Sequence, residues 1–568
     1  MRLIGLVSTF VVVGVALSAC APPAPSSSGD AARGSTQPQG PKAITIALEG
    51  EPDALGVRLG LSSNTIGNAL GPAVHQRLSS YDDRGDIFPQ MAAELPSQAA
   101  GSWIVRDDGT MQTTYRLRPG ITWHDGAPLV TRDFVFAWTI FSDAELPVRG
   151  ALANRIARID TPDDSTLVIE WKRTYPFANV LVEDDLGPLP THAIGDIYQS
   201  DRERFMQLPY WGKEFVGVGP YQLTAWEPGS YLILKAYDRF YAGRAKIDQI
   251  TVQFIQSGPT AVANLLAGTV DGAWSAVEFE QAMVVKDEWE RAGKKPTLVA
   301  QPTHWRWINT QFRVPNPTDI LDPRVRQGLY QAVDRQAMVE ALFAGQAPVS
   351  DTFITSQNPK WDWIKDAFVK YEYNPQRAQQ TLSQTTWRAS GSGTLLNAAG
   401  EPVTVSLVTT PGGAGERELA MIGDSWKALG VTVNQTILSR ADADDHIVRA
   451  SFASFELSSN PAHFGTLTTI LYGRECPSEQ TRWVGRNRGC YLSPEMDRIV
   501  DGLQVAIDPT QQRTLYRDLA KLLSEDLPIL PLYFPVRTSI FREGITGIKG
   551  RAMPSGGETW NVAQWDVM

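Results

Sequence analysis

Residues 117–129 read LRPGITWHDGAPL and are followed by TRDFV at 131–135, and together they give the strongest indication of the fold class. Its Pro-Gly pair ends a short strand predicted at 115–117, and its His-Asp-Gly triplet is typical of a tight turn. Thr131 or Asp133 can then cap a helix, because apolar residues follow at helical spacing. A strand, a turn and a helix in close succession indicate a mixed α/β protein.

The rest of the chain continues this alternation. We predict strands at 44–48, 166–171, 231–235 and 528–533, and helices that begin at Asp322-Pro323, at Asp334 and at Pro509. The absence of a short-period repeat in the sequence argues against solenoids and propellers. Because 568 residues exceed what one hydrophobic core supports, we expect two or more lobes.

The composition narrows the functional class. The formal net charge of −10 argues against a nucleic-acid partner, since proteins that bind nucleic acid are usually basic. The apolar share of 43% is that of an ordinary globular protein. The 17 Trp, 16 Tyr and 20 Phe indicate either a large core or a binding cavity with aromatic walls.

The N-terminus predicts export. A basic start, an apolar run at 3–19 and the ending LSAC at 17–20 describe an export signal at 1–20, and this ending resembles the bacterial lipobox. We expect Cys20 to carry a lipid, although a plain secretory signal with an incidental Cys would look similar. Residues 21–42 are rich in Pro, Ser and Gly, which indicates a flexible tether. The protein is expected to be lipid-anchored to the cell membrane, facing the periplasm or the extracellular side.

The other two cysteines are Cys476 and Cys490. In an oxidising compartment we expect them to form a disulfide, with two free buried thiols as the alternative. The turn-rich segment between them would gain about 3 kcal/mol from closure in the chain-entropy model.

A search for catalytic motifs finds none. The sequence contains no G-x-S-x-G elbow, no phosphate-binding loop and no H-E-x-x-H pair, and its six His are scattered singly. The acidic clusters at 184–185 and 442–445 lack the pattern of a calcium loop and are more typical of solvated surface. We therefore predict no enzyme, no metal site and no cofactor.

The opening stretch resembles the signature of the family 5 solute-binding proteins of ABC transporters, the peptide- and nickel-binding type. Further blocks of that family follow in order: LPTH ending at 192, GVGPYQL at 217–223 with WEPG at 226–229, YDRFY at 237–241 with IDQI at 247–250, ANLLAGTVD at 263–271, and NT at 309–310 with DPRVRQ at 322–327 and AVDR at 332–335. The resemblance covers residues 44–548. Most of these motif residues, His124 among them, are typical of scaffold rather than of ligand contacts.

The resemblance implies an α/β, two-lobe periplasmic-binding-protein-like fold of class II, cluster C type. Lobe I is expected at 43–80, 217–304 and 545–568, an extra subdomain of lobe I at 81–216, and lobe II at 305–544. It also implies a monomer that captures oligopeptides between hinged lobes and delivers them to the permease subunits of an ABC transporter. Two alternatives stay open: another cargo such as an oligosaccharide, which aromatic rings would suit, and a lipid-anchored hydrolase, which would need an activated nucleophile.

Four residues are candidate ligand contacts by their position. Glu49 follows the first strand, at the sheet edge where open α/β sheets bind ligands. Trp274 follows the turn at 268–271, and Trp305 and Trp307 flank the expected crossover between lobes. Each of the three tryptophans could equally be part of the core.

Three further candidate ligand contacts, all on one segment, are chosen by resemblance. In peptide-binding relatives an Asp after a lobe II strand pairs with the amino terminus of the peptide. The corresponding segment here, FASFELSSNPAHF at 452–464, lacks that carboxylate but contains Ser458 and Asn460. Because a buried ammonium without a counter-charge is costly, Glu456 is the candidate substitute.

Overall fold

The computed structural model describes residues 40–55, 65–147, 152–181, 186–462, 464–551 and 557–568. All of them except Gly40 belong to one unit, Pro41–Met568. The predicted signal segment 1–20, its lipidation site Cys20 and residues 21–39 of the predicted tether lie outside the described residues.

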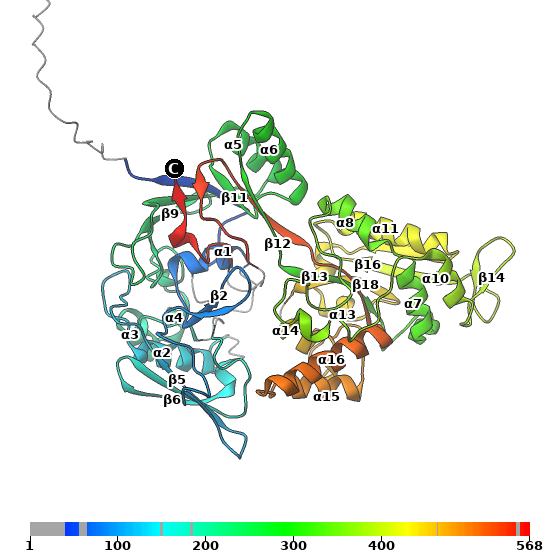
Figure 1. Ribbon diagram of the computed structural model, residues 1–568, viewed down its shortest axis with the longest axis horizontal. Coiled ribbons are helices and arrows are strands. Elements are labelled where there is room, and N and C mark those ends of the chain that lie inside the picture. Colours follow the sequence, from blue (N-terminus) through cyan, green and yellow to red (C-terminus); the bar gives the residue numbers. More distant parts are fainter. Residues whose placement is uncertain (1–39, 56–64, 148–151, 182–185, 463, 552–556) are drawn as a thin grey trace, which may run out of the picture. The chain divides into compact units, whose positions relative to one another are not determined.

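A seven-stranded sheet forms around the first predicted strand. Its order is β12 (Thr297–Pro302), β20 (Val536–Phe541), β11 (Gly272–Trp274), β1 (Ala43–Leu48), β10 (Gln249–Phe254), β9 (Tyr231–Ala236) and β8 (Tyr221–Glu227). β1 runs parallel to both β10 and β11, so these three strands end at one edge of the sheet. The helices α5 (Gly258–Ala267) and α6 (Phe279–Arg291) pack on each other and lie beside β11 (Figure 1).

The opening stretch lies beside a four-stranded antiparallel sheet. This sheet has the order β4 (Trp103–Val105), β5 (Met111–Arg116), β7 (Thr166–Trp171) and β6 (Ile156–Asp163). The predicted helix is α2 (Thr131–Ser142), and the Asp133 carboxylate accepts hydrogen bonds from the backbone N–H of Val130 at 3.2 Å and from the Trp123 indole at 3.1 Å. Asp133 therefore caps the helix and fixes the buried indole before it.

His124 connects this stretch to the seven-stranded sheet. Its Nδ1 accepts a hydrogen bond from the backbone N–H of Gly217 at 3.2 Å, and its Nε2 lies 3.0 Å from the carbonyl oxygen of Gly219. Gly219 has no room for a side chain, because a Cβ would lie 2.4 Å from the backbone of Val74. These contacts confirm that His124 is a scaffold residue.

A five-stranded sheet is built from the second half of the chain, in the order β17 (Thr432–Ile437), β16 (Thr404–Thr409), β18 (Phe455–Pro461), β13 (His304–Thr310) and β19 (Ile529–Tyr533). One hydrophobic core is formed by side chains of this sheet together with those of α7 (Pro323–Gln331), α8 (Arg335–Phe343), α10 (Pro375–Leu382) and α11 (Gly415–Ala428). A second hydrophobic core is formed by side chains of the same sheet together with those of α14 (Phe464–Ile470), α15 (Pro494–Leu503) and α16 (Pro509–Asp526). The side chains of Asp322 and Asp334 cap α7 and α8, as predicted.

Further elements complete the described part of the chain: α1 (Thr65–Val74), β2 (Ser79–Tyr81), β3 (Ile87–Pro89), α3 (Thr191–Ser200), α4 (Arg202–Met206), α9 (Trp361–Ile364), β14 (Arg388–Ala389), β15 (Leu395–Leu396), α12 (Arg440–Asp444), α13 (His446–Ala450), β21 (Ile545–Thr546) and β22 (Asp566–Val567). Single-turn 3₁₀ segments connect several of them.

The chain crosses twice between the seven-stranded and the five-stranded sheet. β12 continues into β13 through Thr303, and β19 continues into β20 through Phe534 and Pro535. The first crossover, at Thr303, lies next to residue 305, where lobe II is expected to begin. The second does not lie near residue 545: β20 is inside the range expected for lobe II, yet it pairs with β11 and β12. The division into lobes and subdomain otherwise stays a prediction.

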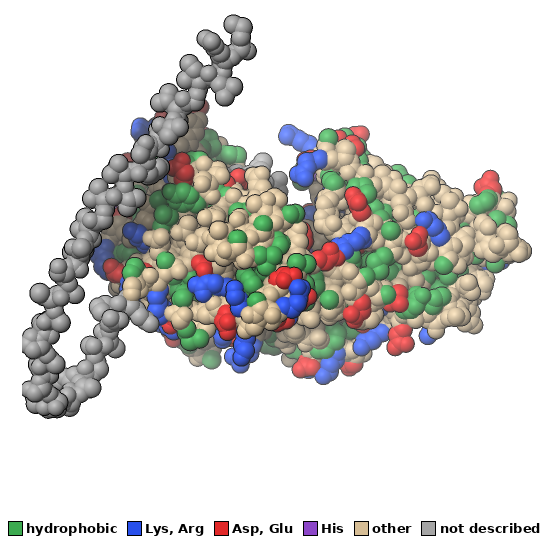
Figure 2. Space-filling model, turned by 90° about the horizontal axis from the view of Figure 1, so that it is seen from above, with side chains coloured by type: hydrophobic (Ala, Val, Ile, Leu, Met, Phe, Trp, Pro, Cys, Tyr) green, Lys and Arg blue, Asp and Glu red, His purple; other side chains and the backbone are tan. Residues whose placement is uncertain are grey.

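Charged side chains are mixed on the face of the molecule shown in Figure 2, where Lys and Arg alternate with Asp and Glu over the surface. A nucleic-acid-binding face would instead gather Lys and Arg.

Candidate functional site

A cavity lies at the two crossovers. It has a volume of about 210 Å³, and we call it the hinge cavity. It is lined by Glu49, Ser275, Val277, Glu278, Phe279, Thr303, His304, Pro535, Val536, Arg537 and Thr538. These residues come from the ends of β1 and β11, the start of α6 and both crossover strands. A ligand here would contact the segments that a hinge motion must bend.

Glu49 lines the hinge cavity, at the sheet edge where the sequence predicts it. It follows the last residue of β1 and is exposed. A second carboxylate, that of Glu278, stands at the start of α6, four residues after β11 ends. Sequence reasoning missed Glu278, although the rule that singled out Glu49 applies equally to the end of the neighbouring parallel strand.

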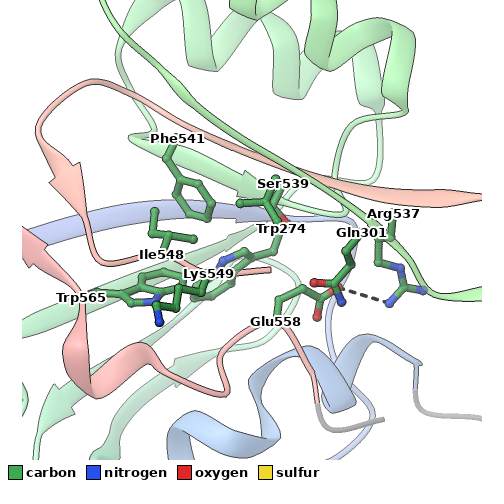
Figure 3. A pocket seen from close by; sticks show the side chains of 10 residues that line it. Trp274, Gln301, Arg537, Ser539, Phe541, Ile548, Lys549, Glu558 and Trp565 are labelled. Carbon is green, nitrogen blue, oxygen red and sulfur yellow. Dashed lines mark hydrogen bonds and ion pairs between the residues drawn. The ribbon is translucent and has the colours of Figure 1, made fainter. Parts of the chain in front are cut away.

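The electrostatics of the hinge cavity are acidic. Glu278 is exposed at the protein surface, yet the protein atoms around its carboxyl, and then the charge of Glu49, raise its pKa, while Arg417 acts in the opposite direction. Arg417 itself forms an ion pair with Glu280. The cation in the cavity lining, Arg537, pairs with Glu558 at 3.3 Å (dashed line in Figure 3).

Trp274 does not line the hinge cavity. It is fully buried at the end of β11, with its ring 5.7 Å from that of Trp565, and Figure 3 shows Phe541 and Ile548 close to this pair. The cavity in Figure 3 has a volume of only about 10 Å³, which is room for about one water molecule. In this structure Trp274 packs the core, and its ligand contact stays a prediction.

Trp305 and Trp307 also lie in the core. Both are 1% exposed and belong to the cluster with α14, α15 and α16. The Trp305 indole donates to the Ser350 hydroxyl at 2.9 Å, and the Trp307 indole donates to Asn309 Oδ1 at 2.7 Å. Because both rings are buried, neither has a face open to a ligand here. Both indole N–H groups already donate to partners inside the protein.

The three candidates on β18 share one face of the five-stranded sheet. Glu456, Ser458 and Asn460 alternate along the strand and stand opposite Asn309, Trp307 and Trp305 of β13. The candidates on β13 and β18 therefore lie on neighbouring strands, and Ser458 is buried and lines neither the hinge cavity nor the cavity shown in Figure 3. Their contact with a ligand stays a prediction.

Glu456 is neutralised inside the protein. The residue is 1% exposed, and its carboxylate accepts hydrogen bonds from Arg449 Nε at 2.7 Å and from Asn309 Nδ2 at 2.9 Å. A second guanidinium, that of Arg488, lies 3.6 Å away. Because Arg449, Arg488 and Asn309 already surround this carboxylate, it is a poor partner for a ligand ammonium.

The arginines around β18 were missed in the sequence. Arg486 donates to Asn460 Oδ1 at 3.0 Å, and Arg486 and Arg488 lie in the segment between the two cysteines. Cys476 and Cys490 are disulfide-bonded, with their Cα atoms 4.8 Å apart. Gly489 sits against the end of β13, where a Cβ would lie 2.2 Å from the carbonyl oxygen of Thr310. The disulfide-closed segment thus brings basic side chains to this sheet, which the turn-rich composition alone did not indicate.

The described residues contain no group of three or more His, Cys, Asp or Glu side chains placed to hold a metal ion. None of the helices in the described ranges combines the length and the hydrophobicity of a membrane span.

Comparisons with known proteins agree on one family. The model of the bacterial extracellular solute-binding proteins, family 5 (middle), matches residues 94–465. The oligopeptide-binding protein AppA of Bacillus subtilis is 22% identical over 99% of this chain and 98% of its own length. The glutathione-binding protein GsiB of Salmonella paratyphi A is 23% identical over 86% of this chain and 88% of its own.

Solved structures share the fold. The structure of AppA in complex with a nonapeptide aligns with a TM-score of 0.68 and 20% identity, covering 94% of this chain and 100% of that one. NikA from Brucella suis, in complex with Fe(III)-EDTA, aligns with a TM-score of 0.73 and 16% identity, covering 93% of this chain and 100% of that one. The predicted two-lobe α/β fold is confirmed.

Proposed function

Because the chain belongs to the family 5 bacterial extracellular solute-binding proteins, we propose that it captures oligopeptides outside the cytoplasm and delivers them to the permease of an ABC importer. Proteins of this family bind solutes for transport and are not enzymes, so the chain is a solute binder. The observation that carries the choice of peptides is the match to an oligopeptide-binding protein over 99% of the chain.

The geometry supports capture by hinge bending. Two strand crossovers join the sheets, and the hinge cavity lies on them. A ligand that contacts both crossovers and both flanking sheets binds one relative arrangement of them best, and it shifts the population toward that arrangement. Peptides suit such a site because main-chain hydrogen bonds give affinity without dependence on side chains.

We further propose that the protein is a monomer held at the membrane by a lipid on Cys20, with residues 21–42 as its tether. Support comes from the small residues before Cys20 and from the polar, Pro-rich composition of the tether. Lipidation is tested by the mass of the N-terminal proteolytic fragment, which should exceed the mass of residues 20–42 by that of the attached lipid. An unmodified fragment beginning at another residue would exclude the anchor.

A second cargo class, oligosaccharides, is weakened by the burial of the candidate rings. Sugar stacking needs an aromatic face open to the cleft, whereas Trp274, Trp305 and Trp307 are all in the core. We therefore rank peptides first.

The deciding experiment is mass spectrometry of ligands released by denaturing full-length protein purified from a peptide-rich lysate. Mixed short peptides at near-stoichiometric yield would support the proposal. A single non-peptide mass or a glycan series would keep the transport role and change the cargo. An empty protein that also retains nothing from a synthetic peptide pool would refute peptide capture.

A further inference from the structure

The part of the molecule built on the four-stranded sheet also meets the part built on the five-stranded sheet away from the crossovers. Ile507, between α15 and α16, packs against the hydrophobic core of the four-stranded sheet. Gln504, at the end of α15, accepts a hydrogen bond on Oε1 at 3.4 Å from Arg155, which directly precedes β6. None of these three residues belongs to a crossover or lines the hinge cavity.

A lysine joins the same two parts. Lys360 Nζ lies 4.5 Å from the centre of the Tyr516 ring on α16, and it donates a hydrogen bond to the hydroxyl of that ring at 3.2 Å. The Phe177 ring, in the segment after β7, lies 5.8 Å from the same Nζ. A cation attracted by aromatic rings of both parts holds these parts together.

Both rings are fixed to their own part. The Tyr115 hydroxyl of β5 donates to the carbonyl oxygen of Ala178 at 2.6 Å, and Ala178, next to Phe177, is buried in the core of the four-stranded sheet. Tyr516 is 5% exposed and belongs to a core of the five-stranded sheet. Separating Phe177 from Lys360 therefore requires the two parts to move relative to each other.

Side chains on the first part connect these contacts. The Arg155 guanidinium lies 5.0 Å from the centre of the Tyr175 ring, and that ring lies 5.8 Å from the Phe177 ring, edge to face. We call the whole set the second contact. It consists of Arg155, Tyr175 and Phe177 on the part with the four-stranded sheet, and of Lys360, Gln504, Ile507 and Tyr516 on the part with the five-stranded sheet.

The second contact restrains rotation about the crossovers. Two parts joined by crossovers can rotate about them, whereas side-chain contacts at another place hold over only part of that rotation. Opening separates Phe177 from Lys360 and exposes Ile507, so it loses a cation–π contact and buried apolar surface. The second contact therefore favours the arrangement in which it is made, which we call closed.

The second contact also carries an opposing cost. Burial lowers the pKa of Lys360 to about 8, which means that its ammonium has lost part of its hydration. This loss works against the packing of Ile507 and of the aromatic rings. The second contact is therefore weaker than its apolar area alone would make it, and it can break when the protein opens.

We propose that the second contact is a latch, which holds the two parts in the closed arrangement and slows the release of the captured solute. The inference rests on the proposed solute-binding function and assigns control of release to residues that do not line the hinge cavity. Release requires opening, so its rate follows the fraction of open molecules. A change that weakens the second contact should raise both.

The first test measures release. Full-length protein is loaded with a synthetic pool of isotope-labelled tripeptides to pentapeptides, an excess of the unlabelled pool is added, and the labelled peptides that stay bound are followed by mass spectrometry. We expect Phe177→Ala and Ile507→Ala each to speed release about tenfold, because each removes apolar contact that only the closed arrangement makes. Tyr373→Ala and Val505→Ala are the matched controls, since both side chains are exposed and lie outside the second contact, and they should release at the wild-type rate. Unchanged release in both contact variants, or equal acceleration in the controls, would overturn the inference while peptide capture stands.

A covalent bridge tests the same contact without removing apolar packing. The double variant Arg155→Cys with Gln504→Cys is treated with a short bismaleimide, and mass spectrometry of proteolytic fragments identifies the bridge. The bridged protein should retain preloaded peptides after the wild type has released them, and when bridged empty it should take up none. Each single variant with the same reagent is the control. Failure of the bridge to form, or release from the bridged protein at the wild-type rate, would refute the latch.

A third readout does not depend on peptides. Small-angle X-ray scattering compares the radius of gyration of peptide-free Phe177→Ala/Ile507→Ala with that of Tyr373→Ala/Val505→Ala, at a temperature at which circular dichroism shows both to be folded. The contact variant should have the larger radius, because more of its molecules are open. If no protein retains the pool, peptide capture fails, and this comparison decides the inference: a larger radius supports the latch, and equal radii refute it.

Discussion

Replacing Glu456 by Gln tests whether this residue stabilises the fold or binds the ligand. In the structure its two carboxylate oxygens accept from Arg449 at 2.7 Å and from Asn309 at 2.9 Å. A glutamine side chain has the same shape but only one acceptor oxygen, so its amide N–H₂ would face one of the two donors.

The size of the effect follows from these contacts. One charge-assisted hydrogen bond is lost, and the Arg449 guanidinium, 13% exposed, loses its counter-ion. Hydrogen bonds to charged groups contribute about 1.5–3 kcal/mol, and breaking a buried ion pair costs about 3–5 kcal/mol. Because Arg449 and Arg488 keep some contact with water, we expect Glu456→Gln to lower the free energy of unfolding by about 3 kcal/mol.

The assay is urea denaturation followed by tryptophan fluorescence, with Glu495→Gln as the matched control. Glu495 forms an exposed ion pair with Arg498, so its loss should cost at most about 0.5 kcal/mol. Retention of the peptide pool by folded Glu456→Gln should equal that of the wild type. The reasoning is refuted if the variant is as stable as the control, and a stable variant that no longer retains peptides would make Glu456 the ligand anchor instead.

Three further predictions concern stability. Replacing Cys476 and Cys490 together by Ser should lower the free energy of unfolding by about 3 kcal/mol, measured in urea; a loss below about 1 kcal/mol would mean that the closed segment contributes little. Gly219→Ala should lower the free energy of unfolding by about 2–3 kcal/mol, because the new Cβ would overlap backbone atoms. Gly71→Ala, inside α1, adds a Cβ with no atom within 4 Å and should leave the free energy of unfolding unchanged or raise it. Equal thermal stability of the two variants would contradict this. Burial among three aromatic rings lowers the pKa of Lys360 to about 8. The unfolded chain then binds the proton more tightly, so the free energy of unfolding should rise between pH 8 and 10.5. Lys360→Met should remove that rise. Identical pH profiles of the wild type and Lys360→Met would exclude a contribution of Lys360.

Local signals in the sequence predicted the elements well. The side chains of Asp322 and Asp334 cap their helices, and Pro509 stands in the first turn of α16. The alternating residues at 44–48 form β1. Caps and alternation depend on residues within a few positions of one another, so they can be recognised without knowing the fold.

The site was predicted only in part. Glu49 was found because the end of a parallel strand is a local position with a general meaning. Glu278 also follows a parallel strand, but only the pairing of β11 with β1 shows that the two carboxylates line one cavity, and Thr538 joins this lining through the pairing of β20 with β11. For the tryptophans, sequence left core and ligand contact equally open, and burial in the structure decided for the core.

The family, the α/β class and the pair of cysteines able to bond can be predicted from the sequence alone, because each depends on contiguous motifs or on residue type. The places where charge is left unpaired become visible only in the folded chain. Glu456 and Glu278 are both acidic residues near strands, yet one has two arginines around it from α13 and the disulfide-closed segment, and the other faces Glu49 with no ion-pair partner among the described residues. Electrostatic balance depends on the neighbours in space, which come from segments far apart in the chain, and no local pattern encodes it.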